Sequence, residues 1–120
     1  MSLLDRIRKA GAPATTAEAD RLALKQLEGR GADLTQPRHV IHFLYFTDEP
    51  DAHRAADAIE RAGYEATVDA PSDTIPEWTV RAEGNRVVGA ATVGAFRAWF
   101  EQMATEFRGE YDGWEAAAQP

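Results

Sequence analysis

The side chains best able to exchange protons near neutral pH are three histidines, and their positions argue against a shared site. His39 and His42 lie in an apolar run typical of a β-strand, where an odd separation places two side chains on opposite faces of a sheet. His53 lies in the following helical segment, with Asp51 and Asp57 as its nearby carboxylates. This spacing does not supply the ligand set of a metal site. We therefore interpret His39 and His42 as hydrogen-bonded strand residues and His53 as a surface residue, and we expect no bound metal.

Pairs of carboxylates also occur, but none lies in a segment that predicts an apolar cleft. General acid–base catalysis needs two such groups held in a cleft with separated pKa values. The pairs lie at a helix start, on a helix exterior or beside a turn, where acidic residues serve capping and solvation; they are Asp48/Glu49, Asp57/Glu60 and Glu110/Asp112. The chain has no cysteine, and it has no Walker loop, dinucleotide fingerprint or Gly-x-Ser-x-Gly elbow. We expect neither catalytic residues nor a cofactor.

The most distinctive segment is Gly-Glu-Tyr-Asp-Gly-Trp-Glu at residues 109–115. It combines two large amphipathic rings with three carboxylates, a mixture suited to a protein interface whose rings anchor and whose charges orient. The rings could instead pack under the preceding helix, with Gly113 admitting a bulge or a close backbone approach. Buried rings would make the segment a feature of the fold, and exposed rings would make it an interface. The candidate protein-binding residues are Glu110, Tyr111, Asp112 and Trp114.

Charge is distributed unevenly along the 120 residues, whose length and composition indicate one globular domain. The formal net charge is −7; residues 1–40 hold seven basic and five acidic side chains, and residues 41–120 hold six and fifteen. Such an acidic surface favours a basic partner, for example an RNA-binding protein, although it can also simply maintain solubility. It disfavours direct binding of RNA by the aromatic strand face, whose members are His39, Ile41, Phe43 and Tyr45, with Trp78 expected on an adjacent strand.

The first twelve residues are too charged for the apolar core of a signal peptide, and no apolar run approaches the ~20 residues that span a bilayer. We expect a cytoplasmic protein with no membrane contact.

The pattern of apolar residues predicts an α+β domain over residues 16–116, preceded by a flexible segment 1–15 and followed by a short tail 117–120. Thr15 and Glu18 resemble a capping box. The expected helices are residues 17–27, 47–63 and 92–107, and the expected strands are residues 38–46, 64–69, 78–82 and 110–116; residues 86–89 could extend or flank the third strand.

This order predicts a ferredoxin-like two-layer sandwich, in which a four-stranded antiparallel sheet carries two helices on one face. The other face needs a cover, which the N-terminal helix, a second copy or a target protein could supply.

At residues 110–114 (Glu-Tyr-Asp-Gly-Trp), which follow the last helix, the chain resembles the RraB family, bacterial regulators of the endoribonuclease RNase E. The resemblance continues through residues 62–67 (Ala-Gly-Tyr-Glu-Ala-Thr) and through residues 42–45 before a helix with an acidic start, and it covers about residues 18–116. It implies a ferredoxin-like sandwich and a non-catalytic protein that binds the endoribonuclease and lowers its activity. Family members carry a long acidic C-terminal tail, whereas Glu115 is the one charged residue after Trp114 here. The fold could therefore serve that ribonuclease or a different partner.

Two other functions remain open on the sequence alone. A sheet of this kind can carry a small-molecule sensor or an enzyme, which would require a closed pocket with convergent polar groups. It can also act as a dimerisation module that uses its open face.

Overall fold

Residues 16–118, which the computed structural model describes, form helices and strands in the predicted order. The expected segment 1–15, with Thr15 of the capping box, and the last two residues of the tail lie outside this range. The elements are α2 (Thr16–Gly29), β1 (Pro37–Phe46), α3 (Glu49–Arg61), β2 (Glu65–Asp69), β3 (Trp78–Val87), α4 (Ala90–Glu106) and β4 (Gly109–Ala116).

The strands form one antiparallel sheet in the order β2-β3-β1-β4, which is the predicted ferredoxin-like arrangement. β1 pairs with β3 over its whole length, from Pro37 opposite Val87 to Phe46 opposite Trp78. The third strand therefore continues beyond the predicted 78–82 and ends within residues 86–89, the segment that could extend or flank it, because β1 offers a pairing partner as far as its first residue. β1 and β3 form the centre of the sheet, and β4 and β2 are its edges.

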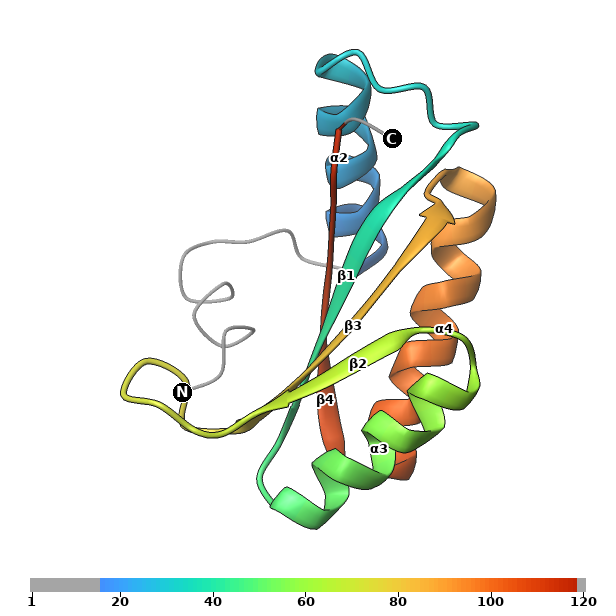
Figure 1. Cartoon of the computed structure of the whole chain (residues 1–120). Helices are drawn as coiled ribbons and strands as arrows, with labels where there is room; N and C mark the ends of the chain where they lie inside the picture. Colours follow the sequence, from blue (N-terminus) through green and yellow to red (C-terminus); the bar gives the residue numbers. More distant parts are fainter. Residues whose placement is uncertain (1–15, 119–120) are drawn as a thin grey trace.

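The core lies between the sheet and the helices α3 and α4, which Figure 1 shows on one side of the strands. Alternation along β1 directs Val40, His42 and Leu44 into this layer, and all three are fully buried. The predicted apolar stripe of α3 is confirmed, and α4 contributes Phe96 and Phe100. The buried stripe of α3 consists of Ala52, Ala55, Ala56 and Ile59.

The N-terminal helix does not cover the open face of the sheet, although it is one of the covers suggested for that face. α2 packs beside α4, where the Arg97 guanidinium donates to both carboxylate oxygens of Asp20, at 2.5 and 2.7 Å. Leu24 and Leu27 of α2 join the same core cluster as the residues of α4. α2 and α3 thus lie at opposite ends of the molecule (Figure 1).

The open face carries a central apolar strip with acidic neighbours. Ile41 and Phe43 of β1 form the strip. The register places Arg81 of β3 opposite Phe43, where it pairs with Asp69, and it places further carboxylates around the strip. Trp78 is not part of this face, because it is in phase with the inward Val80, and its ring lies 6.5 Å from that of His53 on α3. The carboxylates at open-face positions are Glu65, Asp69, Glu83, Glu110 and Glu115.

Candidate functional site

A β-bulge in β4 determines how the distinctive segment is presented. Phe43 of β1 lies opposite Gly113, but the next residue, Leu44, lies opposite Tyr111, so that Asp112 is the extra residue. Gly113 adopts φ +105°, a conformation that L side chains rarely adopt. In a regular strand, residues three apart face opposite sides of the sheet, whereas here the bulge turns both Tyr111 and Trp114 toward the helices.

Replacement of Gly113 by alanine is expected to destabilise the protein by about 1–2 kcal/mol, the usual cost of a left-handed backbone for an L residue. The nearest atom to the added Cβ would be Nη2 of Arg97 at 3.9 Å, so the loss would report backbone strain and not a steric clash. Urea unfolding followed by tryptophan fluorescence measures this change. Gly94→Ala is the matched control, because Gly94 lies within α4 with open space around its Cβ and should gain about 0.5–1 kcal/mol. An unchanged midpoint for Gly113→Ala would contradict the assignment of strain.

Tyr111 belongs to the interior. Its hydroxyl is hydrogen-bonded to Nδ1 of His42 at 2.8 Å, and its ring stacks on Phe100 with centroids 5.5 Å apart. Burial raises the pKa of the Tyr111 hydroxyl well above its ordinary value. The ring therefore holds β4 against the core and is not available as a contact for a partner.

Trp114 links three elements through its indole. Its Nε1–H donates to Oδ1 of Asp20 on α2 at 2.9 Å, and its ring meets the edge of Phe96 on α4 at 5.7 Å. The same carboxylate receives the two donors of Arg97, whose third donor nitrogen reaches Glu101 at 3.1 Å. This network fixes the distance between α2 and β4.

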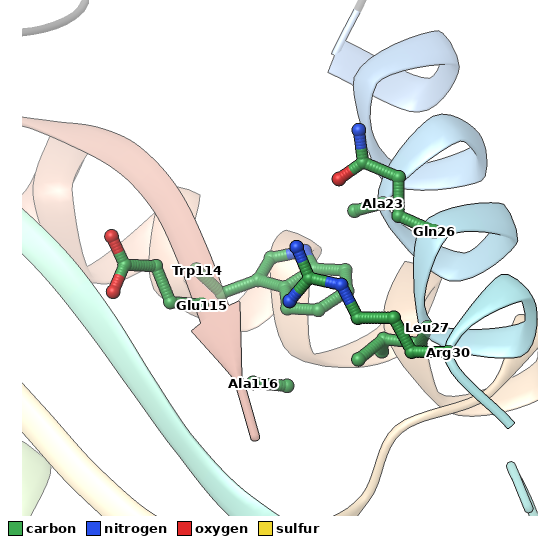
Figure 2. Close-up of a pocket in the computed structure, with 7 residues that line it drawn as sticks. All are labelled: Ala23, Gln26, Leu27, Arg30, Trp114, Glu115 and Ala116. Atoms are coloured by element: carbon green, nitrogen blue, oxygen red, sulfur yellow. The ribbon is translucent and has the colours of Figure 1, made fainter. Parts of the chain in front are cut away.

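A pocket of about 290 Å³ lies between α2 and the C-terminal half of β4 (Figure 2). We call it the α2–β4 groove. Trp114 remains half-buried beside it, and Glu115 is directed to the side of β4 away from α2 (Figure 2). The residues that line the groove are Ala23, Gln26, Leu27, Arg30, Trp114, Glu115 and Ala116.

The predicted site residues do not converge on one surface. Glu110 is exposed at an open-face position, Trp114 lines the groove on the helical side, and Tyr111 is buried between them. The carboxylate oxygens of Asp112 are shielded from solvent at the bulge. The α2 wall of the groove was not predicted, since it lies more than 80 residues from β4 in the sequence and carries no local signal.

Titratable groups are dispersed over the part of the chain that the structure describes. His39 pairs with Glu83 on the open face and His53 with Glu49 at the start of α3, at 3.1 and 3.2 Å, while His42 is buried. Within residues 16–118 no group of three or more potential ligands could hold a metal ion, and no helix is long and apolar enough to cross a bilayer.

Polar side chains do gather in a second pocket, of about 280 Å³, at the N-terminal end of β4. It is lined partly by Glu77, Glu110 and Arg108, and the last of these also donates to Asp51 at 2.9 Å. The Asp51 carboxyl has a lowered pKa, chiefly because of this hydrogen bond from Arg108. Arg108 therefore serves to join the end of α4 to the start of α3.

Comparison with known families agrees with the resemblance in the β4 segment. Residues 17–116 match the family model RraB, described as Regulator of ribonuclease activity B. No curated protein sequence matches the chain. Because the matched range includes every described element from α2 to β4 apart from the first residue of α2, the chain belongs to the RraB family.

Proposed function

We propose that this protein regulates an endoribonuclease of the RNase E type in the bacterial cytoplasm by binding it directly, without catalysing a reaction. Membership of the RraB family supports the first part of this proposal, the regulation of a ribonuclease. The direct contact is supported above all by one observation: β4 is an edge strand that places Trp114 in an open groove on its helical side and exposes Glu110 and Glu115 on the other side.

The side chains on the two sides of β4 suit recognition of a basic protein. Trp114 is held in one orientation by its bond to Asp20, and a fixed tryptophan beside a groove is a frequent centre of binding energy. Glu110 and Glu115 are exposed on the same strand. With a chain of net charge −7, they would accelerate association with a positively charged partner.

Charge reversal by Glu110→Lys with Glu115→Lys is expected to weaken binding of the ribonuclease at least ~10-fold, because both carboxylates would face the partner. Inhibition of RNA cleavage should be relieved in parallel. Calorimetric titration of the purified ribonuclease measures the affinity, and cleavage of a labelled RNA measures the inhibition. The matched control is Asp57→Lys with Glu60→Lys, which makes the same change in net charge on the exposed face of α3. Equal weakening by the two pairs would show that only long-range charge acts, and no binding by the wild-type chain would refute the proposed function.

A further inference from the structure

The outer edge of β4 presents backbone groups that the sheet does not use. The Ala117 N–H donates to the His39 carbonyl at 2.9 Å, which marks these two directly opposed residues as a hydrogen-bonded pair. Bonded and non-bonded pairs alternate in an antiparallel ladder. The pairs that contain Ala116 and Trp114 are therefore non-bonded, and their N–H and C=O groups point away from β1. An edge strand with such groups is a template for another strand.

Arg38 keeps this edge in place. Its guanidinium is buried, and Nη1 donates to the carbonyls of Ala117 and Ala118 at 3.1 and 2.7 Å. Nη2 donates to the carbonyl of Asp33 at 2.5 Å, which joins the end of β4 to the segment before β1. Because the edge is already ordered, an incoming strand would not have to order it on binding.

The two sides of the edge differ in chemistry. On the helical side, the α2–β4 groove has an apolar floor of Leu27, Ala23 and the Trp114 ring. The longer side chains of Gln26 and Arg30 also line it, and its volume of about 290 Å³ leaves room for an apolar side chain. On the open side, Glu115 and Glu110 are exposed. Successive side chains of an added strand would point alternately to these two sides. Opposite charges directly across neighbouring strands are stabilising, and like charges are destabilising.

We propose that β4 receives an extended protein segment as a fifth strand of the sheet, a segment in which apolar residues alternate with lysine or arginine. Its apolar side chains enter the α2–β4 groove, and its basic side chains lie beside Glu110 and Glu115. The outward groups of Trp114 and Ala116 supply the backbone hydrogen bonds, the mode known as β-augmentation. This inference rests on the proposed function, because it names the chemistry of the ribonuclease segment that the same site would bind.

The substitution Ala116→Pro tests the backbone contribution. The Ala116 N–H points outward, so proline removes a donor for the incoming strand without removing one from the ladder with β1. We expect the full chain with Ala116→Pro to bind the purified ribonuclease at least ~10-fold more weakly than wild type. Ala116→Val, which has a side chain of similar size and retains the N–H, should stay within about 3-fold. Wild-type affinity of the proline variant, or equal losses in both variants, would overturn the inference.

A second measurement uses the wild-type chain and does not depend on a variant that folds. Hydrogen exchange of the Trp114 and Ala116 amides should slow when the ribonuclease is added, since both would become strand donors. If these two amides exchange at the same rate with and without bound ribonuclease, strand addition is overturned. If the ribonuclease binds with these amides unprotected, the proposed function stands and this mode of binding fails. If it does not bind at all, a synthetic peptide of alternating valine and lysine tests the edge by itself, and failure to protect the two amides would reject it.

Discussion

Lowering the pH from about 7 to about 4 is expected to remove about 3 kcal/mol of folding stability through one side chain, His42. The imidazole is fully buried, and burial lowers its pKa from 6.5 to about 3, with smaller contributions from the charges of Arg86 and Arg97. Its ring stacks on Phe100 with centroids 3.9 Å apart, and Nδ1 is bonded to Tyr111. The folded state therefore holds the neutral ring.

The direction follows from the two pKa values. Above pH 6.5 the imidazole is neutral in both the folded and the unfolded chain, so His42 adds no pH dependence there. Below pH 6.5 only the unfolded chain binds the proton, and stability falls with each pH unit until pH 3. The carboxyls of Asp33 and Asp51 also have lowered pKa values, through hydrogen bonds from Thr35 and Arg108, but their stabilisation is lost only near and below pH 3.8. The interval between pH 4 and 6.5 thus reports His42.

Urea titrations across this interval measure the slope directly. The double variant His42→Phe with Tyr111→Phe removes the imidazole and the hydroxyl bonded to it, so it should lose most of the slope while remaining within about 1 kcal/mol of wild type at pH 7. His39→Gln, which changes an exposed histidine on the open face, is the control and should retain the slope. A wild-type slope in the double variant would show that another group binds the proton.

Replacement of Asp20 by alanine is expected to cost about 3–5 kcal/mol, because it leaves the Arg97 guanidinium without its main partner. The Arg97 side chain is only 13% exposed, and it makes two hydrogen bonds to Asp20, which also receives the Trp114 N–H. Binding of the ribonuclease should weaken as well, since α2 would lose its attachment to β4 and the groove would lose a wall. Thermal and urea unfolding measure the first effect, and calorimetric titration of the folded variant measures the second.

The same helix provides the comparison for Asp20. Glu18 lies one half-turn earlier and forms an exposed ion pair with Arg21 at 3.8 Å, so Glu18→Ala should change stability by less than ~1 kcal/mol. Asp20→Asn keeps an acceptor for the Trp114 N–H but loses the charge opposite Arg97, and it should fall between the alanine variant and wild type. Similar small effects for Asp20→Ala and Glu18→Ala would show that the network does not hold α2.

Several elements could be predicted because their patterns are local. The continuous apolar run of β1 indicates a central strand, and steps of three and four from Val93 through Phe100 indicate the buried face of α4. A possible bulge at Gly113 could also be predicted, because a glycine within a strand pattern often marks one. The side of the sheet on which Trp78 lies could also be predicted, because Trp78 alternates in phase with Val80 and Ala82, which both face the core.

The position of α2 could not be predicted in the same way. Its Leu24 and Leu27 would suit the open face of the sheet as well as the edge beside α4. The contact that selects the edge joins Asp20 to Arg97, which are 77 residues apart, and charge pairs at that separation leave no periodic pattern. The groove is formed by both α2 and β4 and therefore could not be predicted from the sequence. The consequence of the bulge was also not predictable from spacing. An odd separation predicts opposite faces for Tyr111 and Trp114, whereas the bulge turns both toward the helices.

The exposed carboxylates of β4 also determine which strands would pair unfavourably with its edge. If a second copy of the chain paired its own β4 with this one, Glu110 and Glu115 of both copies would be brought onto one narrow ribbon without intervening cations. Such homotypic pairing is penalised by repulsion, whereas a cationic strand of another protein is not. This repulsion would keep the edge from growing into self-assembled sheets and would leave it free for the cationic segment proposed above.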